Sequence, residues 1–148
     1  MKKFLITIFC LLVGCGYQPI YIGSTNQDLL FKDIKLIGNK TINKKIVSSL
    51  KIKKDTSINN SKEIIITSDK LITEIAKNSK GQTETYRTTI NLNITIKDKE
   101  NILKNKNFNE NFSYKNIDNK FDLRVYQDDV EINLTKKIIE ELIIYLNL

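Results

Sequence analysis

The chain has 148 residues and a formal net charge of +7, with 24 lysines and arginines against 17 aspartates and glutamates. It has no histidine, the commonest general base and metal ligand, and only two cysteines, Cys10 and Cys15. It also has no glycine-rich phosphate loop, no cysteine–histidine metal motif and no internal repeat. These features argue against an enzyme and a metal protein, and they favour a binding or assembly protein.

The first fourteen residues have the parts of an export signal. Two lysines precede an apolar run over residues 4–13, and Gly14 and Cys15 follow it. A run of ten residues is too short for a membrane-spanning helix, which needs ~20 residues. The sequence Leu12-Val13-Gly14-Cys15 resembles the bacterial lipobox, which implies cleavage between Gly14 and Cys15, diacylglycerol on the Cys15 thiol and acylation of the new amine. An ordinary cleaved signal without lipid is the alternative.

Removal of residues 1–14 would leave 148 minus 14, or 134, residues, enough for one domain with a buried core. Cys10 would leave with the signal and Cys15 would carry lipid, so no thiol would remain for a disulfide. Without Lys2 and Lys3 the charge is 22 minus 17, or +5. Scattered lysine is typical of a solvated surface, and attraction to anionic glycolipid or an anionic membrane is a second use. No nucleic-acid partner is expected, because arginine forks and stacking aromatic side chains are not clustered.

Residues 15–28 predict a lipidated tether, and residues 29–148 a single domain. Residues 30–37 alternate in polarity like a half-buried strand, and Gly38-Asn39 has the chemistry of a turn. Thr41 is the expected cap of a helix whose apolar side chains recur at helical spacing. Residues 51–62 contain few apolar side chains and predict a loop.

The clearest strand covers residues 83–97, where even-numbered positions are mostly apolar and odd-numbered positions are polar. Such a long strand needs a long partner, expected at residues 63–77 through a hairpin loop at Ser79-Lys80-Gly81. A helical stripe over residues 71–76 is the alternative, which the β-branched residues before it disfavour. The alternation breaks at residues 68–70, which predicts a bulge or a twist there.

A third strand is expected after a polar turn at residues 97–101. Ile102, Phe108, Phe112 and Tyr114 share even parity, and asparagines occupy the odd positions. Glu110 interrupts the apolar side, which predicts looser pairing at that point.

From Phe121 onward, apolar residues recur every three or four positions to the C-terminus, which predicts a long amphipathic helix. Asp128 and Asp129 would be spread around this helix, so they are interpreted as solvated charges rather than metal ligands.

The predicted fold is therefore α+β, with two helices packed on one face of a four-stranded mixed or antiparallel sheet in the order β-α-β-β-β-α. The other face of the sheet would be polar and open. Strands of about fourteen residues exceed the usual ~5–6, so the long hairpin is expected to project toward a partner.

Three segments together carry a resemblance to a known family. Residues 12–21 end in Cys-Gly-Tyr-Gln-Pro-Ile-Tyr, and residues 80–87 predict a glycine hairpin leading into a threonine-rich Tyr-Arg strand. Phe112-Ser113-Tyr114 and the Asp128-Asp129 pair follow in the last third of the chain. In this order the segments resemble the lipopolysaccharide-assembly lipoprotein family, LptE, in its alphaproteobacterial form. The chain departs from the pattern by its lysine and asparagine content and by Gly38-Asn39-Lys40, where an arginine is expected.

The resemblance implies an outer-membrane lipoprotein, lipid-anchored on the periplasmic side. It would plug and help assemble the β-barrel translocon LptD and assist insertion of lipopolysaccharide into the outer leaflet. The implied partners are an LptD-type barrel, lipopolysaccharide and membrane lipid through the acyl chains on Cys15, with no cofactor beyond that covalent lipid. Gly16 after Cys15 is compatible with release to the outer membrane.

Arg87 lies on the polar face of the longest expected strand and is a candidate contact for the barrel wall or a lipopolysaccharide phosphate. A solvated arginine is the alternative. Two other functions stay open: a periplasmic-facing lipoprotein chaperone of general outer-membrane protein assembly, and a surface-exclusion or adhesion lipoprotein.

Overall fold

The computed structural model describes residues 28–57 and 61–146. The predicted signal peptide, its cleavage site at Gly14 and the lipid attachment site at Cys15 lie outside the described residues.

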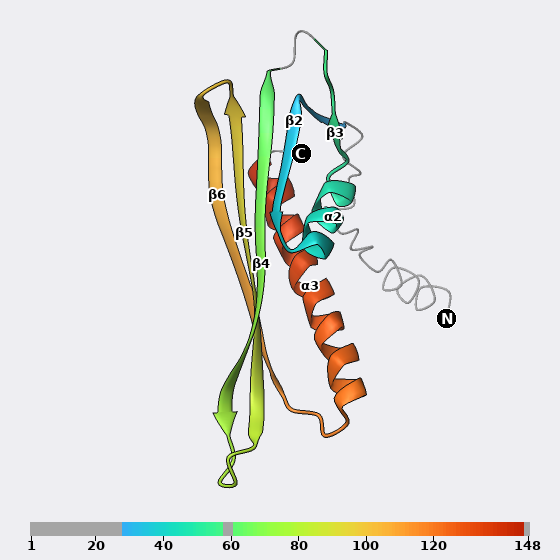
Figure 1. Cartoon of the computed structure of the whole chain (residues 1–148), viewed down its shortest axis with the longest axis vertical. Coiled ribbons are helices and arrows are strands. Elements are labelled where there is room, and N and C mark those ends of the chain that lie inside the picture. The colour runs from blue at the N-terminus through green and yellow to red at the C-terminus, as the bar shows by residue number, and fades with distance from the viewer. Residues whose placement is uncertain (1–27, 58–60, 147–148) are drawn as a thin grey trace, which may run out of the picture.

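The described part of the chain forms a four-stranded sheet, a small two-stranded sheet and two helices. The larger sheet contains β2 (Asp33–Gly38), β4 (Lys62–Lys77), β5 (Thr83–Asp98) and β6 (Asn101–Lys115), in the order β2-β4-β5-β6. β2 runs parallel to β4, and the other neighbours are antiparallel. The small sheet pairs β1 (Leu29–Phe31) with β3 (Ile52–Lys54). The helices α2 (Lys40–Ser49) and α3 (Lys120–Leu146) lie on the same side of the larger sheet (Figure 1). The predicted α+β fold is confirmed.

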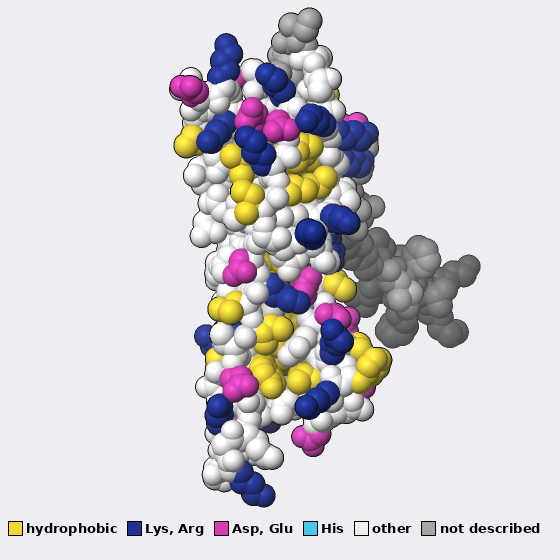
Figure 2. All heavy atoms as spheres, viewed as in Figure 1, with side chains coloured by type: hydrophobic (Ala, Val, Ile, Leu, Met, Phe, Trp, Pro, Cys, Tyr) yellow, Lys and Arg dark blue, Asp and Glu magenta, His cyan; other side chains and the backbone are white. Residues whose placement is uncertain are grey.

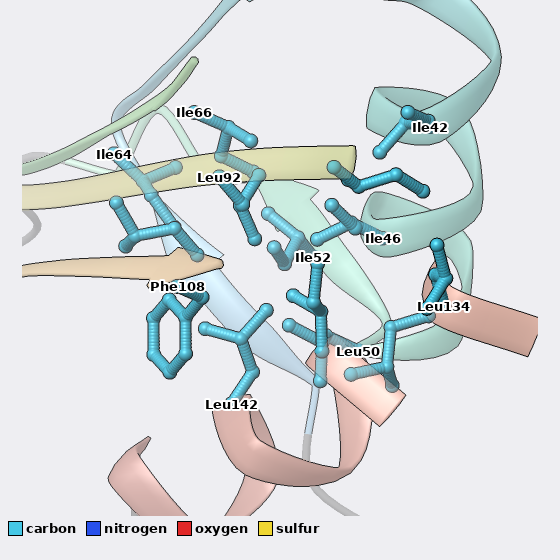
Figure 3. Close-up of a cluster of buried hydrophobic side chains, with 14 of the residues drawn as sticks. Ile42, Ile46, Leu50, Ile52, Ile64, Ile66, Leu92, Phe108, Leu134 and Leu142 are labelled. Carbon is cyan, nitrogen blue, oxygen red and sulfur yellow. The ribbon is translucent and has the colours of Figure 1, made fainter. Parts of the chain in front are cut away.

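The core lies between the sheet and the two helices. Alternation places even-numbered side chains of β4 and β5 on the inner face, and helical spacing brings side chains of α2 and α3 against them. Figure 3 shows these side chains pointing toward one another; fully or almost fully buried among them are Ile42, Ile46, Leu50, Ile64, Ile66, Leu92, Phe108, Leu134 and Leu142. The alternation in residues 83–97 and the spacing after Phe121 therefore predict the core correctly.

The turn between β2 and α2 needs a glycine for two reasons. Gly38 has φ +88°, and a Cβ there would lie 1.9 Å from the carbonyl oxygen of Ser68. The following residue, Asn39, caps α2, because its side-chain oxygen accepts hydrogen bonds from the backbone N–H groups of Thr41 and Ile42 at 3.0 and 3.1 Å. Thr41 was expected to cap this helix, and that prediction is wrong. The N-cap is Asn39, two residues earlier, because the helix begins directly after the turn at Gly38.

Two short strands differ from the prediction. The single strand predicted over residues 30–37 is divided between β1 and β2, and β3 was not expected. β3 lies within residues 51–62, which predict a loop, and it pairs with β1 just before β2. Three-residue strands are too short to show alternation, although Ile52 is buried as the single apolar anchor of β3.

The bulges lie elsewhere than predicted. β4 pairs with β5 in unbroken register through residues 68–70, and the register shifts occur between Glu74 and Lys77. Ser68 causes the break in alternation because it is a polar residue buried on the inner face, where its hydroxyl donates to the carbonyl of Asn39 at 3.2 Å.

A second shift corrects the prediction for β6. It falls after Ile96, so that Ile102 pairs with Lys97 and not with an inner-face residue. Ile102 therefore does not share the buried face of Phe108. Glu110, in contrast, keeps its register opposite Ile90 and lies 4.0 Å from the ammonium of Lys137 on α3. The expected looser pairing at Glu110 is wrong, since the ladder with β5 continues through this residue without a shift.

The sheet is covered unevenly along its length. β2 pairs only with residues 63–68 of β4, and α2 packs beside it, so one end of the molecule has two helices over the sheet (Figure 1). We call this end the two-helix half. The one-helix half consists of residues 69–77 of β4, 83–91 of β5, 109–115 of β6 and 120–133 of α3. There α3 is the only described element that covers the inner face.

Candidate functional site

The described residues contain no group of three or more side chains that could hold a metal ion. Asp128 and Asp129 are therefore not part of such a group within the described ranges. Within the same ranges, neither helix is apolar enough over a sufficient length to cross a membrane. The candidate sites are therefore surfaces, and the one-helix half exposes three of them.

The first surface is the outer face of the sheet, which contains Arg87. Arg87 is exposed on β5 between Thr73 of β4 and Ser113 of β6. Its Nε donates a hydrogen bond to the Ser113 hydroxyl at 3.1 Å. No carboxylate among the described residues forms an ion pair with it, so its remaining N–H groups are available to an anionic oxygen. This placement agrees with the predicted position on the polar face.

Uncharged amides dominate the same face beside Arg87. The Asn109 side chain donates to Asn91 at 2.5 Å, and the Asn93 side chain donates to Asn105 at 3.2 Å. Asparagines occupy two successive odd positions of β5 and four of β6, and these side chains point outward. Asn91, Asn109 and Asn111 lie in the one-helix half, and Asn93, Asn105 and Asn107 continue the face into the two-helix half. The face is thus a hydrated, hydrogen-bonding surface with little charge.

The second surface is the edge of β4 beyond β2. Backbone hydrogen bonds from Lys32 to Lys62 and from Asn39 to Ser68 show that even-numbered residues of β4 turn their peptide groups toward β2. Because this alternation continues, Lys70 and Ile72 present their peptide groups at the same edge, where no described strand pairs with them. The shifts after Glu74 end this regular stretch. Such an edge is a template for another strand.

The third surface is an apolar stripe on α3, formed by Phe121, Val125 and Ile132. Their exposed fractions are 73%, 45% and 50%. Ile139 lies two turns after Ile132 on the same side of the helix and is buried. The burial changes along the stripe because α2 packs against α3 in the two-helix half only.

Polar and aromatic contacts join α3 to the sheet beneath these surfaces. Lys70 of β4 forms a largely buried ion pair with Glu131 of α3. Tyr114 packs edge-on against Tyr126 of α3, with ring centroids 5.4 Å apart, and its hydroxyl lies 3.0 Å from that of buried Thr88. These contacts attach α3 to the sheet, so helix and sheet present the open surfaces of the one-helix half together.

The sequence predicts Arg87 and the polar face, and it misses the other two surfaces. The open edge arises because β2 covers less than half of β4, and strand length alone does not reveal where two strands pair. Phe121 and Ile132 have the same polarity as buried helix residues, so periodicity does not show that they lack a covering layer.

No protein-family model and no curated protein matches this sequence. The fold is similar to the crystal structure of rare lipoprotein B from Shewanella oneidensis, with a TM-score of 0.60 and 6% identity over 78% of this chain and 93% of that chain. It is also similar to the solution structure of a lipoprotein B from Nitrosomonas europaea, with a TM-score of 0.57 and 10% identity over 78% and 81% of the two chains. The chain thus shares the fold of these two lipoproteins.

Proposed function

We propose that this chain is an outer-membrane lipoprotein, anchored through Cys15 on the periplasmic side, that plugs an LptD-type β-barrel. It would help assemble that barrel and assist insertion of lipopolysaccharide into the outer leaflet. The observation that carries the proposal is the one-helix half: a long end of this lipoprotein fold with an open sheet face, strand edge and helix stripe.

These three surfaces suit the inside of a large barrel. Inward side chains of such barrels are polar and hydrated, and the asparagines of β5 and β6 offer them hydrogen-bond donors and acceptors. The edge of β4 and the stripe containing Phe121 supply backbone and apolar contacts for periplasmic loops or for a barrel that is still folding. Burial of these surfaces in one partner would protect the chain from aggregation.

Arg87 is the proposed contact for the barrel wall or a lipopolysaccharide phosphate. A guanidinium binds phosphate through two parallel hydrogen bonds, and a lysine ammonium cannot reproduce this geometry. If Arg87 acts in this way, Arg87→Ala and Arg87→Lys should both impair barrel recovery or lipopolysaccharide export. The role of Arg87 is abandoned if Arg87→Ala leaves both unchanged.

Affinity purification of the detergent-solubilised, lipidated protein tests the function as a whole. We expect a stoichiometric large β-barrel of the LptD type to be recovered with it. Recovery of general barrel-assembly components alone would contradict the proposal and favour a general assembly chaperone. The Cys15→Ala variant serves as the control for the anchor, because it should lose outer-membrane fractionation.

A further inference from the structure

Positive charge is concentrated in one segment of the chain. Residues 28–62 contain nine lysines and three acidic residues, a net charge of +6. Residues 63–146 contain 13 basic and 14 acidic residues, a net charge of −1. The segment from β1 to β3 therefore carries the whole positive excess of the folded part. In Figure 2, dark-blue side chains gather over the upper half of the molecule around exposed apolar side chains.

Many of these lysines are not neutralised within the protein. Acidic partners lie near three of them: Asp28 at 2.7 Å from Lys53, Asp33 at 3.0 Å from Lys54 and Glu63 at 3.6 Å from Lys35. Five others have no ion-pair partner among the described residues: Lys32, Lys40, Lys44, Lys45 and Lys51. Unpaired cations at this density favour an anionic partner over a merely solvated surface.

Some of these lysines surround a groove between β2, α2 and β3. The groove has a volume of about 540 Å³, and Leu36, Val47 and Ile52 supply its apolar lining. Its polar lining comes from Asp28, Lys44, Ser48, Lys51 and Lys53. Lys40, Lys44 and Ser48 follow one another at i, i+4 and i+8, which extends the positive rim along one side of α2. Such a groove is chemically complementary to a phospholipid headgroup, because the ammonium groups can bind its phosphodiester and the apolar side chains can contact its glycerol region.

The groove also lies where the anchored segment enters the fold. Asp28 lines it and is the first described residue, thirteen positions after Cys15. Thirteen residues span at most about 45 Å when fully extended. A chain anchored at Cys15 therefore keeps this groove within reach of the leaflet that holds the lipid.

We propose that the groove between β2, α2 and β3 docks on the anionic phospholipid headgroups of the membrane surface to which the chain is tethered. Lys44 and Lys51 contact headgroup phosphates, and Leu36, Val47 and Ile52 contact the glycerol region. The inference goes beyond the barrel partner: it relies on the anchor at Cys15 and not on the presence of LptD. Docking in this way would orient the two-helix half toward the bilayer and leave the one-helix half free.

Fluorescence quenching in vesicles tests the docking without any barrel protein. The mature chain has no thiol apart from the acylated Cys15, so Ser48→Cys places a single fluorophore at the groove and Ser79→Cys places one in the distant β4–β5 loop. The lipidated, labelled proteins are reconstituted in phosphatidylcholine vesicles with and without 30% phosphatidylglycerol, each containing a headgroup spin label. We expect at least about twofold stronger quenching at position 48 with phosphatidylglycerol, lost in high salt, and no such change at position 79.

Charge variants test whether docking depends on the lysines of the groove or only on the net charge of the protein. Lys44→Gln with Lys51→Asn should abolish the phosphatidylglycerol-dependent quenching, since each lysine near the surface contributes roughly a fivefold change in binding. Asparagine is chosen at position 51 because Lys51 has φ +49°, which asparagine tolerates. The matched control, Lys80→Gln with Lys115→Gln, removes the same charge from the β4–β5 loop and the end of β6, away from the groove, and should retain the quenching.

Equal quenching at position 48 in the two kinds of vesicle, or an equal loss in the control variant, would overturn the inference. Flotation with neutral vesicles in high salt reports the Cys15 anchor separately, so loss of anchoring and loss of docking are distinguished.

Discussion

The two halves of this molecule share one sheet and one long helix, but they differ in what covers them. In the two-helix half, β2 pairs with β4 and α2 packs on α3, so Ile42, Ile46 and Ile139 are buried. In the one-helix half, no described element continues this layer, and Ile132 and Phe121 stay exposed. A second layer thus decides whether the same kind of side chain stabilises the fold or remains available to a partner.

The largest expected difference concerns isoleucines on α3. Ile138→Ala removes a fully buried side chain and should lower the free energy of unfolding by about 3 kcal/mol. Ile132→Ala, in the exposed stripe, should change it by less than about 0.5 kcal/mol. Urea unfolding of both variants measures the difference, and a similar cost for both would show that the stripe is already covered.

Two glycines with positive φ give the next comparison. Gly38→Ala in the two-helix half should destabilise the protein by about 3 kcal/mol, because left-handed strain adds to a clash with the Ser68 carbonyl. Gly81→Ala in the β4–β5 loop has φ +77° but open space around its Cβ, so only the strain of about 1 kcal/mol is expected. Equal losses in thermal unfolding would refute the steric explanation at Gly38.

The ion pairs of β4 provide a smaller difference within the one-helix half. Lys70→Ala leaves Glu131 without its partner in a largely buried position and should cost about 2 kcal/mol. Lys77→Ala removes an exposed partner of Glu74 and should cost less than about 0.5 kcal/mol. A double-mutant cycle on Lys70 and Glu131 should reveal a coupling energy of about 1 kcal/mol. Additive effects would mean that this pair does not attach α3 to the sheet.

The smallest expected effect concerns the pKa of Asp33 in the two-helix half. A hydrogen bond from the Lys54 ammonium, together with its charge, holds the pKa of Asp33 below its usual value. A lowered folded-state pKa contributes stability above the unfolded-state value, about 3.9, and that contribution is lost as pH falls through the folded-state pKa. Lys54→Gln should raise the pKa of Asp33 toward its ordinary value in a carboxyl NMR titration, and an unchanged titration would exclude Lys54 as the cause.

The sequence predicts the long elements because their patterns repeat many times. Alternation along most of the 16 residues of β5 identifies this strand, and helical spacing after Phe121 identifies α3. β1 and β3, with three residues each, carry too few repeats to be recognised. The shift after Ile96 also reverses the face of Ile102, because one extra residue moves a side chain to the opposite side of a sheet.

The candidate surfaces are predictable only in part. The place of Arg87 on the polar face is predicted by its odd-numbered position in β5, and its hydrogen bond to Ser113 agrees with that placement. The open edge at Lys70 and Ile72 depends on where β2 stops along β4, which is a property of the tertiary structure. The lipid on Cys15 stays a prediction from its motif, since it lies outside the described residues.

Photocrosslinking in cells tests most directly whether the one-helix half enters a barrel. A photoreactive amino acid is placed at Leu71, exposed on the outer face of β4 beyond β2, and at Ser49, exposed at the end of α2. We expect a crosslink from position 71 to a large outer-membrane β-barrel protein and none to that protein from position 49. A crosslink to the barrel from position 49 alone, or none from position 71 in the anchored protein, would contradict the proposed arrangement.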